Sequence, residues 1–262
     1  MNYSSNPNEE TPPSEINETL YKIKYGYARS YESQIENDKG QDFLAFRLHH
    51  HCISFVVCDG VSLSFCGDVA ASFLGEQLLA WMDHAEFDLL QNEHAAKEEL
   101  LQFLTMAIDE GTDEVKNYHL SAELPPLLKE VLEDKREQGS ETMFVCGRID
   151  FSGDQPHLFL GWSGDLRIRF WKNKKEVEVI TPDLRQVHQR WSTKKGIPSD
   201  DLHVLSLDIL KTSISELMIY TDGLAILDPC NTTPSLRKLY RYMQESFLSP
   251  ESDDLSFFNI VW

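Results

Sequence analysis

The chain contains 262 residues, 41% of them hydrophobic, which is enough to fill a sizeable core in one large domain. Its 43 acidic residues outnumber 24 basic residues and give a formal net charge of −19, which argues against nucleic acid or an anionic membrane surface as a partner. No run approaches the roughly 20 apolar residues of a membrane span, and the N-terminus is polar and acidic, unlike a signal peptide. We therefore expect a cytoplasmic protein.

The N-terminal segment, residues 1–18, holds three prolines and many Asn, Ser and Glu residues but few apolar ones. This composition predicts a disordered arm, and we expect residues 19–262 to form a single domain. Alternating or apolar runs then predict strands, with a polar loop at residues 29–40 and a hairpin turn near residues 48–50. These strands are expected at residues 20–26, 41–46 and 51–58.

Apolar residues at helical spacing predict two long helices, at residues 68–82 and 95–118, and Pro125-Pro126 predicts the start of a third helix that runs to about residue 135. Beyond Gly139 the period changes from helical to alternating, which predicts a four-strand meander. The meander strands are expected at residues 142–150, 157–162, 166–171 and 177–180.

Residues 181–191 are expected to form a loop and a short helix. An amphipathic helix is predicted at residues 234–246, with Thr233 as its N-cap and Pro234 at its first position. The remaining strands are expected at residues 202–207, 217–221 and 257–262. Strands, then helices, then strands in antiparallel runs predict an α+β domain of packed layers and not a series of βαβ units.

Acidic residues mark the ends of several predicted strands. Two apolar runs end in Asp-Gly, at Asp59 and Asp222, while Asp253 precedes the last apolar run and Asp42 opens an earlier one. Carboxylate and carbonyl oxygens without His or Cys favour Mg²⁺ or Mn²⁺ over zinc, so these acids and the Gly60 carbonyl are candidate ligands of a two-metal centre for phosphoryl chemistry. An Asp-Gly step after a strand is also an ordinary turn, so both interpretations stay open.

Four segments carry a resemblance to a known family. The sequences FVVCDGV at residues 55–61, SGDLR at 163–167, IYTDGL at 219–224 and DDLS at 253–256, in this order, resemble the metal-dependent serine/threonine protein phosphatases of the 2C type, with a bacterial-like pattern. The resemblance extends from about Ile23 to Trp262. It implies an α+β fold, a four-layer α-β-β-α sandwich in which two antiparallel sheets carry the metal site and helices cover both outer faces.

The resemblance also implies roles for particular residues. Asp59 matches the aspartate that bridges two Mn²⁺ or Mg²⁺ ions, Gly60 the neighbouring carbonyl ligand, and Asp222 and Asp253 the other direct ligands of one ion. Asp42 is similar to an acid that acts through water. The implied catalytic acids are Asp59 and Asp222, and Asp165 matches an acid that in some members helps to hold a third metal ion.

The implied reaction is hydrolysis of phosphoserine or phosphothreonine by a hydroxide activated between two metal ions, without a phosphoenzyme. The implied partner is a phosphoprotein substrate, and such enzymes commonly oppose a protein kinase. We expect residues 61–66 and 186–202 to form rims of the cleft.

Three positions depart from the family pattern. Val61 stands where many members have a histidine proposed as the general acid, a role that typically contributes about 10²- to 10⁴-fold to the rate. Asn37 stands where many have a phosphate-binding arginine, and Gln41 where glutamate is usual. Arg29 on the same loop is a candidate phosphate-binding replacement, although it also suits a solvated surface charge.

Three interpretations therefore remain open. The first is an active phosphatase, and the second is a catalytically weak or inactive phosphatase-like module that binds a phosphoprotein or signalling partner. The third is an acidic α+β domain unrelated to this family.

Overall fold

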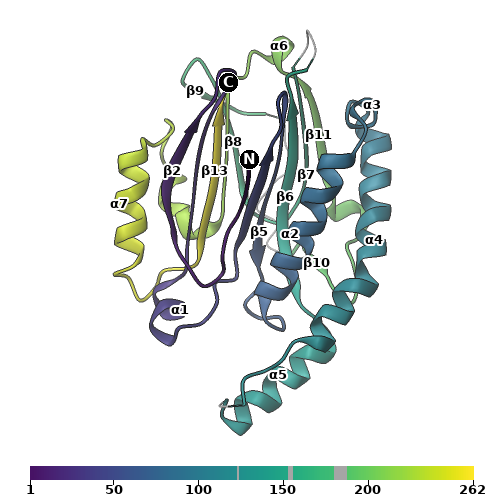
Figure 1. Cartoon of the computed structure of the whole chain (residues 1–262), viewed down its shortest axis with the longest axis vertical. Helices are drawn as coiled ribbons and strands as arrows, with labels where there is room; N and C mark the ends of the chain where they lie inside the picture. Colours follow the sequence, from purple (N-terminus) through teal and green to yellow (C-terminus); the bar gives the residue numbers. More distant parts are fainter. Residues whose placement is uncertain (123, 153–155, 180–187) are drawn as a thin grey trace.

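The computed structural model describes the chain except residues 123, 153–155 and 180–187. Two antiparallel sheets face each other, with α2 and α4 outside the first sheet and α7 outside the second (Figure 1), which confirms the predicted sandwich. In spatial order the first sheet contains β1 (Asn2–Ser4), β4 (Phe43–Leu48), β5 (Cys52–Gly60), β6 (Glu141–Asp150), β7 (His157–Ser163) and β11 (His203–Asp208), with β10 (Trp191–Ser192) beside β6. The second contains β2 (Thr11–Asn17), β3 (Lys22–Ala28), β13 (Leu255–Val261), β12 (Glu216–Tyr220), β8 (Arg167–Lys172) and β9 (Lys175–Val177).

The helices occupy the outer layers and the connections. The predicted pair of long helices is confirmed as α2 and α4, and the helix after the double proline as α5. None of the helices in the described part of the chain is both long and apolar enough to cross a membrane. The helical elements are α1 (Tyr31–Glu36), α2 (Gly67–His84), α3 (Phe87–Leu90), α4 (Glu93–Asn117), α5 (Pro126–Gln138), α6 (Ile209–Thr212), α7 (Leu236–Ser246) and the 3₁₀ turns η1 (Ser199–Asp201) and η2 (Asp222–Leu227).

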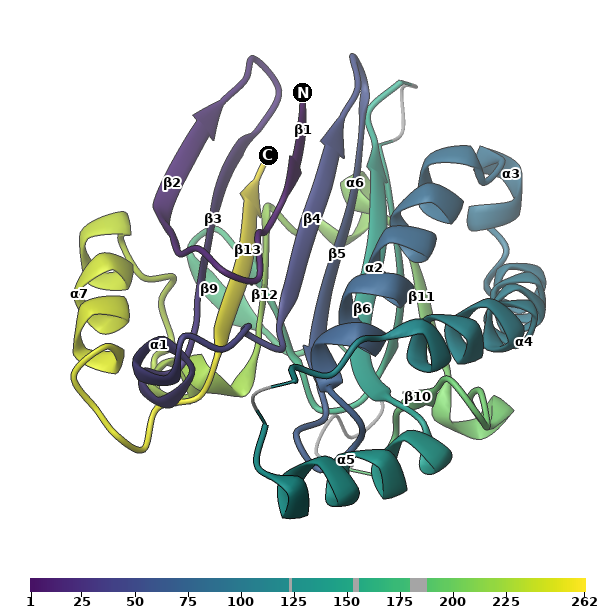
Figure 2. The same cartoon turned by 60° about the horizontal axis from the view of Figure 1, so that its bottom comes forward.

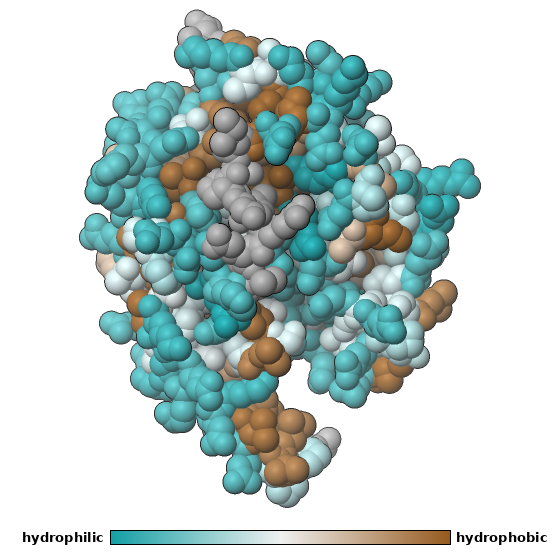
Figure 3. Space-filling model, turned by 180° about the vertical axis from the view of Figure 1, so that it is seen from behind, coloured by the Kyte–Doolittle hydropathy of each residue, from teal (hydrophilic) through white to brown (hydrophobic). Residues whose placement is uncertain are grey.

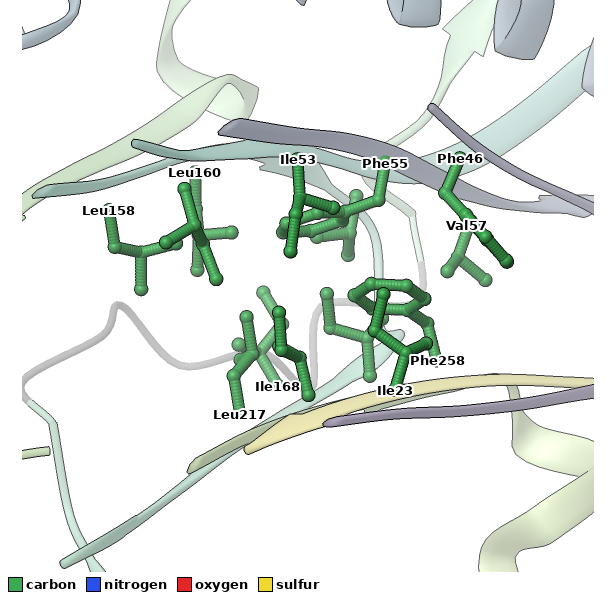
Figure 4. Packing of buried hydrophobic residues seen from close by; sticks show 14 of the residues in the cluster. Ile23, Phe46, Ile53, Phe55, Val57, Leu158, Leu160, Ile168, Leu217 and Phe258 are labelled. Carbon is green, nitrogen blue, oxygen red and sulfur yellow. The ribbon is translucent and has the colours of Figure 1, made fainter. Parts of the chain in front are cut away.

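Strand β5 explains why its sequence is an unbroken apolar run. Phe55 and Val57 point into the core between the sheets, whereas Val56 and Cys58 point toward α2 and α4. Side chains of a strand alternate between its faces, so a strand covered on both sides needs apolar residues at every position. Figure 4 shows Phe55 and its neighbours meeting Phe258 and other side chains of the second sheet.

The prediction of a disordered arm at residues 1–18 was wrong. Strand β1 pairs with β4 and strand β2 pairs with β3, so the arm adds an edge strand to each sheet. An edge strand needs few apolar residues, and Pro12 and Pro13 lie at the register shift between Thr11 and Ser14, where neither proline has a partner on β3. The ring of Tyr3 also stacks on Phe46 at a centroid distance of 5.1 Å.

The predicted meander is divided between the sheets. Strands β6 and β7 pair in the first sheet and β8 and β9 in the second, so the chain crosses the sandwich between Ser163 and Arg167. Gly164 makes the crossing with a φ of +103°, a conformation that glycine adopts without a Cβ penalty. Asp165 is consequently held at the junction of the two sheets.

Three local predictions also need correction, and a fourth is only partly covered by the described residues. The loop at residues 29–40 contains α1, which has no apolar stripe but is capped by the Ser30 hydroxyl. Helix α7 starts at Leu236 with Ser235 as its N-cap, because the Ser235 hydroxyl, and not that of Thr233, accepts from the Lys238 amide. Strand β9 is shorter and earlier than expected. The predicted short helix and the start of the predicted 186–202 rim lie partly outside the described residues.

Candidate metal centre

Acidic side chains from both sheets gather at one end of the sandwich. Asp59 is the penultimate residue of β5, Asp222 opens η2 just after β12, and Asp253 lies two residues before β13. Strands β12 and β13 are neighbours, and the Thr221 amide donates to the Ser256 carbonyl at 3.1 Å where they end. We call this set the acidic edge; it comprises Asp42, Asp59, Asp165, Asp222, Asp253 and Asp254.

These carboxylates interact electrostatically. Burial raises the pKa of Asp59 well above its ordinary value, and the charges of Asp222, Asp253 and Asp165 raise it further. The pKa of Asp222 is likewise raised, to about 6. Loss of solvation is the largest cause, the charges of Asp253 and Asp165 raise the pKa further, and the charge of Arg167 lowers it. The acidic edge therefore favours protons or another source of positive charge over a set of bare carboxylates.

The donor chemistry suits a hard divalent cation, because the candidate ligands are all carboxylate or carbonyl oxygens. However, within the described residues no three His, Cys, Asp or Glu side chains are arranged so that they could hold a metal ion. The residues thus fit Mg²⁺ or Mn²⁺ by chemical type, although the described side chains do not form such a group as they stand in the structure.

Gly60 occupies a position with no room for a side chain. Its amide donates to the Gln41 carbonyl at 3.2 Å, and a Cβ on Gly60 would lie 2.6 Å from the Gln41 carbonyl and from the backbone of Gly67. Gly60 is therefore required for the close approach of β5, the start of β4 and the first turn of α2, independently of any ligand its carbonyl binds.

Asp42 joins the two sheets at the acidic edge. Its side chain is buried and accepts a 2.8 Å hydrogen bond from the Thr221 hydroxyl, which itself accepts from the Ser256 amide at 2.9 Å. Burial raises the pKa of Asp42 well above its ordinary range, and the charges of Asp59 and Asp254 add to the effect. The charges of Asp42 and Asp59 thus act on each other, and the hydrogen-bond partner of the Asp42 carboxylate is a hydroxyl.

Asp254 received no role in the sequence analysis, yet the structure gives it the more buried position of the Asp253-Asp254 pair. Its two carboxylate oxygens accept from the Ser30 and Gln41 amides, each at 2.6 Å. Burial raises the pKa of Asp254, while these two amides lower it. The sequence signal for this role was the pair of consecutive acids. Because consecutive side chains point in different directions, one of the two could face the candidate metal centre and the other the protein interior.

Arg29, the candidate phosphate-binding residue, is engaged elsewhere. Its Nε donates to Glu10 at 2.8 Å and its Nη1 to the Asp38 carbonyl at 3.1 Å, so it fastens the N-terminal segment to the α1 loop. Its charge still lowers the pKa of Asp254, whereas the guanidinium beside Asp165 and Asp222 belongs to Arg167, whose Nη1 donates to the Asp165 carbonyl at 3.2 Å. Arg167 lay within the SGDLR segment but had been given no role.

Comparison with known proteins was informative only at the level of structure: no family model and no curated protein matches the sequence. The serine/threonine phosphatase Stp1 from Staphylococcus aureus superposes with a TM-score of 0.58 at 15% identity, covering 92% of this chain and 94% of the other. The chain has the fold of the 2C-type serine/threonine phosphatases.

Two further structures agree. The serine/threonine phosphatase of S. agalactiae gives a TM-score of 0.57 at 13% identity over 92% of this chain and 99% of the other. The serine-threonine phosphatase 2C from Toxoplasma gondii gives 0.53 at 12% identity over 97% and 98%. These identities concern the fold alone, so activity and residue roles have to be argued from the acidic edge.

Proposed function

We propose that the protein is a metal-dependent phosphatase that hydrolyses phosphoserine or phosphothreonine in a protein substrate. The observation that carries this proposal is the convergence of Asp59, Asp222, Asp253 and Asp165, from four different parts of the chain, into one electrostatic neighbourhood. Like charges held close together cost stability, so their concentration at one end of a phosphatase fold supports a functional site. The corresponding substrate is a cytoplasmic protein that a kinase has phosphorylated.

In this proposal Asp59, the Gly60 carbonyl, Asp222 and Asp253 would hold two Mg²⁺ or Mn²⁺ ions, and Asp165 would contribute to a third. Bound there, such ions would supply positive charge for the phosphoryl group and lower the pKa of water. Residues of the chain position the candidate ligands. The Asp42–Thr221 hydrogen bond fixes the distance between the two sheets, and Asp254 fixes the backbone of Ser30 and Gln41 beside them.

Protonation of the leaving group is expected to be inefficient at the proposed site. Val61 follows Gly60 and has no proton to donate, so the leaving serine or threonine oxygen takes its proton from water. The positive charge of Arg167 acts on the acids of the site, since it lowers the pKa of Asp222. We therefore expect slow turnover compared with enzymes that have a dedicated general acid.

The test is hydrolysis of p-nitrophenyl phosphate and of a phosphothreonine peptide by the full chain, with Mn²⁺ and with EDTA. We expect activity only with Mn²⁺, and loss of activity in Asp59→Asn at unchanged fold. Activity in EDTA, or an Asp59→Asn variant as active as the wild type, would disprove the proposal.

A second candidate function is a non-catalytic phosphatase-like module that binds a phosphoprotein or signalling partner. Two observations favour it: Arg29 is committed to Glu10, and the described acids do not form a ready ligand set. Calorimetry with Mn²⁺ separates the candidates. A cooperatively folded protein that takes up no Mn²⁺ is the binding module, whereas uptake that Asp59→Asn abolishes supports the enzyme.

A further inference from the structure

Helix α5 projects from the sandwich beyond the end at which α1 also lies (Figures 1 and 2). None of its residues is buried, and the exposed fractions of Leu127, Leu128 and Val131 are 74%, 43% and 44%. Figure 3 shows this projection as an apolar area at the foot of the molecule. Apolar side chains grouped on a projecting helix are typical of a surface that another molecule covers.

The C-terminal end of α5 is firmly attached, so this exposure does not reflect a loose helix. Arg136 Nη1 donates to the carbonyls of Val115 and Tyr118 at 2.9 and 2.8 Å, and its guanidinium lies 4.6 Å from the centre of the Phe65 ring. Lys135 donates to the Ser62 carbonyl at 3.3 Å. Helix α5 is therefore held beside the 61–66 loop predicted as a rim.

A groove of about 800 Å³ runs between α5 and the α1 loop. One wall carries Leu128 and Leu132, one helical turn apart, and the other carries Glu32, Glu36 and Asp38. The groove continues to Gln41, Asp253 and Asp254, so it opens directly onto the acidic edge. A chain lying in it would pass the candidate metal centre.

The groove is electrostatically negative. Its described lining contains the carboxylates of Glu32, Glu36, Asp38, Asp68, Asp253 and Asp254 but the ammonium groups of only Lys39 and Lys135. The Lys39 Nζ lies 3.6 Å from the Asp68 Oδ2, so these two opposite charges compensate each other. Such a surface repels anionic lipid and nucleic acid and attracts cationic side chains.

We propose that this groove binds the segment of the substrate protein next to its phosphorylated residue, with a large apolar side chain on Leu128 and Leu132 and basic side chains on the Glu32–Glu36 wall. The inference rests on the proposed function and adds the substrate class, a basic segment with an apolar anchor. Burial of the apolar side chain supplies affinity, and the carboxylates supply the preference for basic sequences.

Docking is measured by fluorescence anisotropy with a labelled, unphosphorylated peptide that carries one leucine and two arginines, so that turnover does not interfere. We expect Glu32→Lys/Glu36→Lys to weaken binding about 3- to 10-fold and Leu128→Gln about 10-fold. Matched controls on α4, Glu98→Lys/Glu99→Lys for charge and Met106→Gln for an exposed apolar residue, leave binding unchanged. A peptide with both arginines replaced by glutamate binds more weakly to the wild type.

The kinetic experiment separates this inference from the proposed function. The groove variants lower kcat/KM for the phosphorylated peptide by the same factors but leave hydrolysis of p-nitrophenyl phosphate unchanged. If the wild type binds the peptide through the groove but hydrolyses neither substrate, the docking site stands and the phosphatase proposal fails. If the wild type hydrolyses p-nitrophenyl phosphate while the groove variants handle the peptide normally, the docking site is disproved. It is also disproved if Leu128→Gln only converts an oligomer into a monomer.

Discussion

The centre of the sandwich and its acidic edge use the same strands in opposite ways. In the centre, Phe55 of β5 stacks on Phe258 of β13 at 4.7 Å, and both faces of the strand are apolar. Four residues further along β5, Asp59 brings a half-buried negative charge close to others. The apolar contacts of the centre stabilise the fold, whereas the like charges of the edge repel one another and oppose it, a cost that is typical of functional sites.

The largest expected effect comes from the centre. Phe55→Ala removes a fully buried ring that contacts the opposite sheet, and we expect it to lower the free energy of unfolding by about 3–5 kcal/mol. Urea denaturation of both proteins measures the difference. Leu63→Ala, at a side chain 84% exposed, is the control and should stay within about 0.5 kcal/mol. A loss below about 1 kcal/mol for Phe55→Ala would contradict this view of the core.

The next effect distinguishes the hydrogen bonds of the edge from its charges. Asp254→Ala leaves the Ser30 and Gln41 amides without their acceptors, and we expect a loss of about 2–3 kcal/mol in urea denaturation. Asp254→Asn keeps one acceptor oxygen and should lose less. Equal stability of Asp254→Ala and wild type would mean that the carboxylate contributes only repulsion.

A change of opposite sign is expected at Asp59. In EDTA, Asp59→Asn removes a half-buried charge that neighbouring acids repel, and we expect the metal-free protein to gain about 1 kcal/mol. Added Mn²⁺ should raise the Tm of the wild type, since a ligand that binds the folded state stabilises it, but not that of the variant. Thermal unfolding with and without Mn²⁺ measures both. A destabilised variant in EDTA would contradict the proposed repulsion.

The same contrast separates what the sequence predicts from what it does not. Local periodicity was sufficient for α2, α4 and β5, because burial on one or both faces imposes a repeating pattern on neighbouring residues. The resemblance added the sandwich. Edge strand β1 was missed because it pairs with the distant strand β4, and edge strand β2 because its two prolines and polar residues hide its pairing with β3, the next strand along the chain.

The acidic edge shows the same limit. Asp59 and Asp222 are recognisable from Asp-Gly at the end of apolar runs, and the structure brings their charges together. The commitment of Arg29 to Glu10, and the burial of Asp254, depend on contacts between segments far apart in the chain. No local pattern encodes such contacts, so the partners of a polar side chain are harder to predict than its position on a strand.

The smallest expected effect tests whether an ionisable group far from the acidic edge behaves differently. His157, at the start of β7, is buried, and burial lowers its pKa, although the charges of Asp208 and Asp150 oppose this. A histidine whose pKa is depressed in the folded state takes up a proton more readily when unfolded, so stability falls as the pH drops below about 6.5. Its ring nitrogen lies 2.9 Å from the Ser206 hydroxyl, which a glutamine amide can still reach.

We therefore expect the wild type to lose up to about 1 kcal/mol more than His157→Gln between pH 7.5 and pH 5.5 in urea denaturation. Carboxylates of the acidic edge titrate in both proteins, and the difference between the two isolates the histidine. A difference of the opposite sign would mean that Asp208 and Asp150 dominate and that His157 is held protonated. In that case charge pairing, and not burial, would govern this end of the sandwich as well.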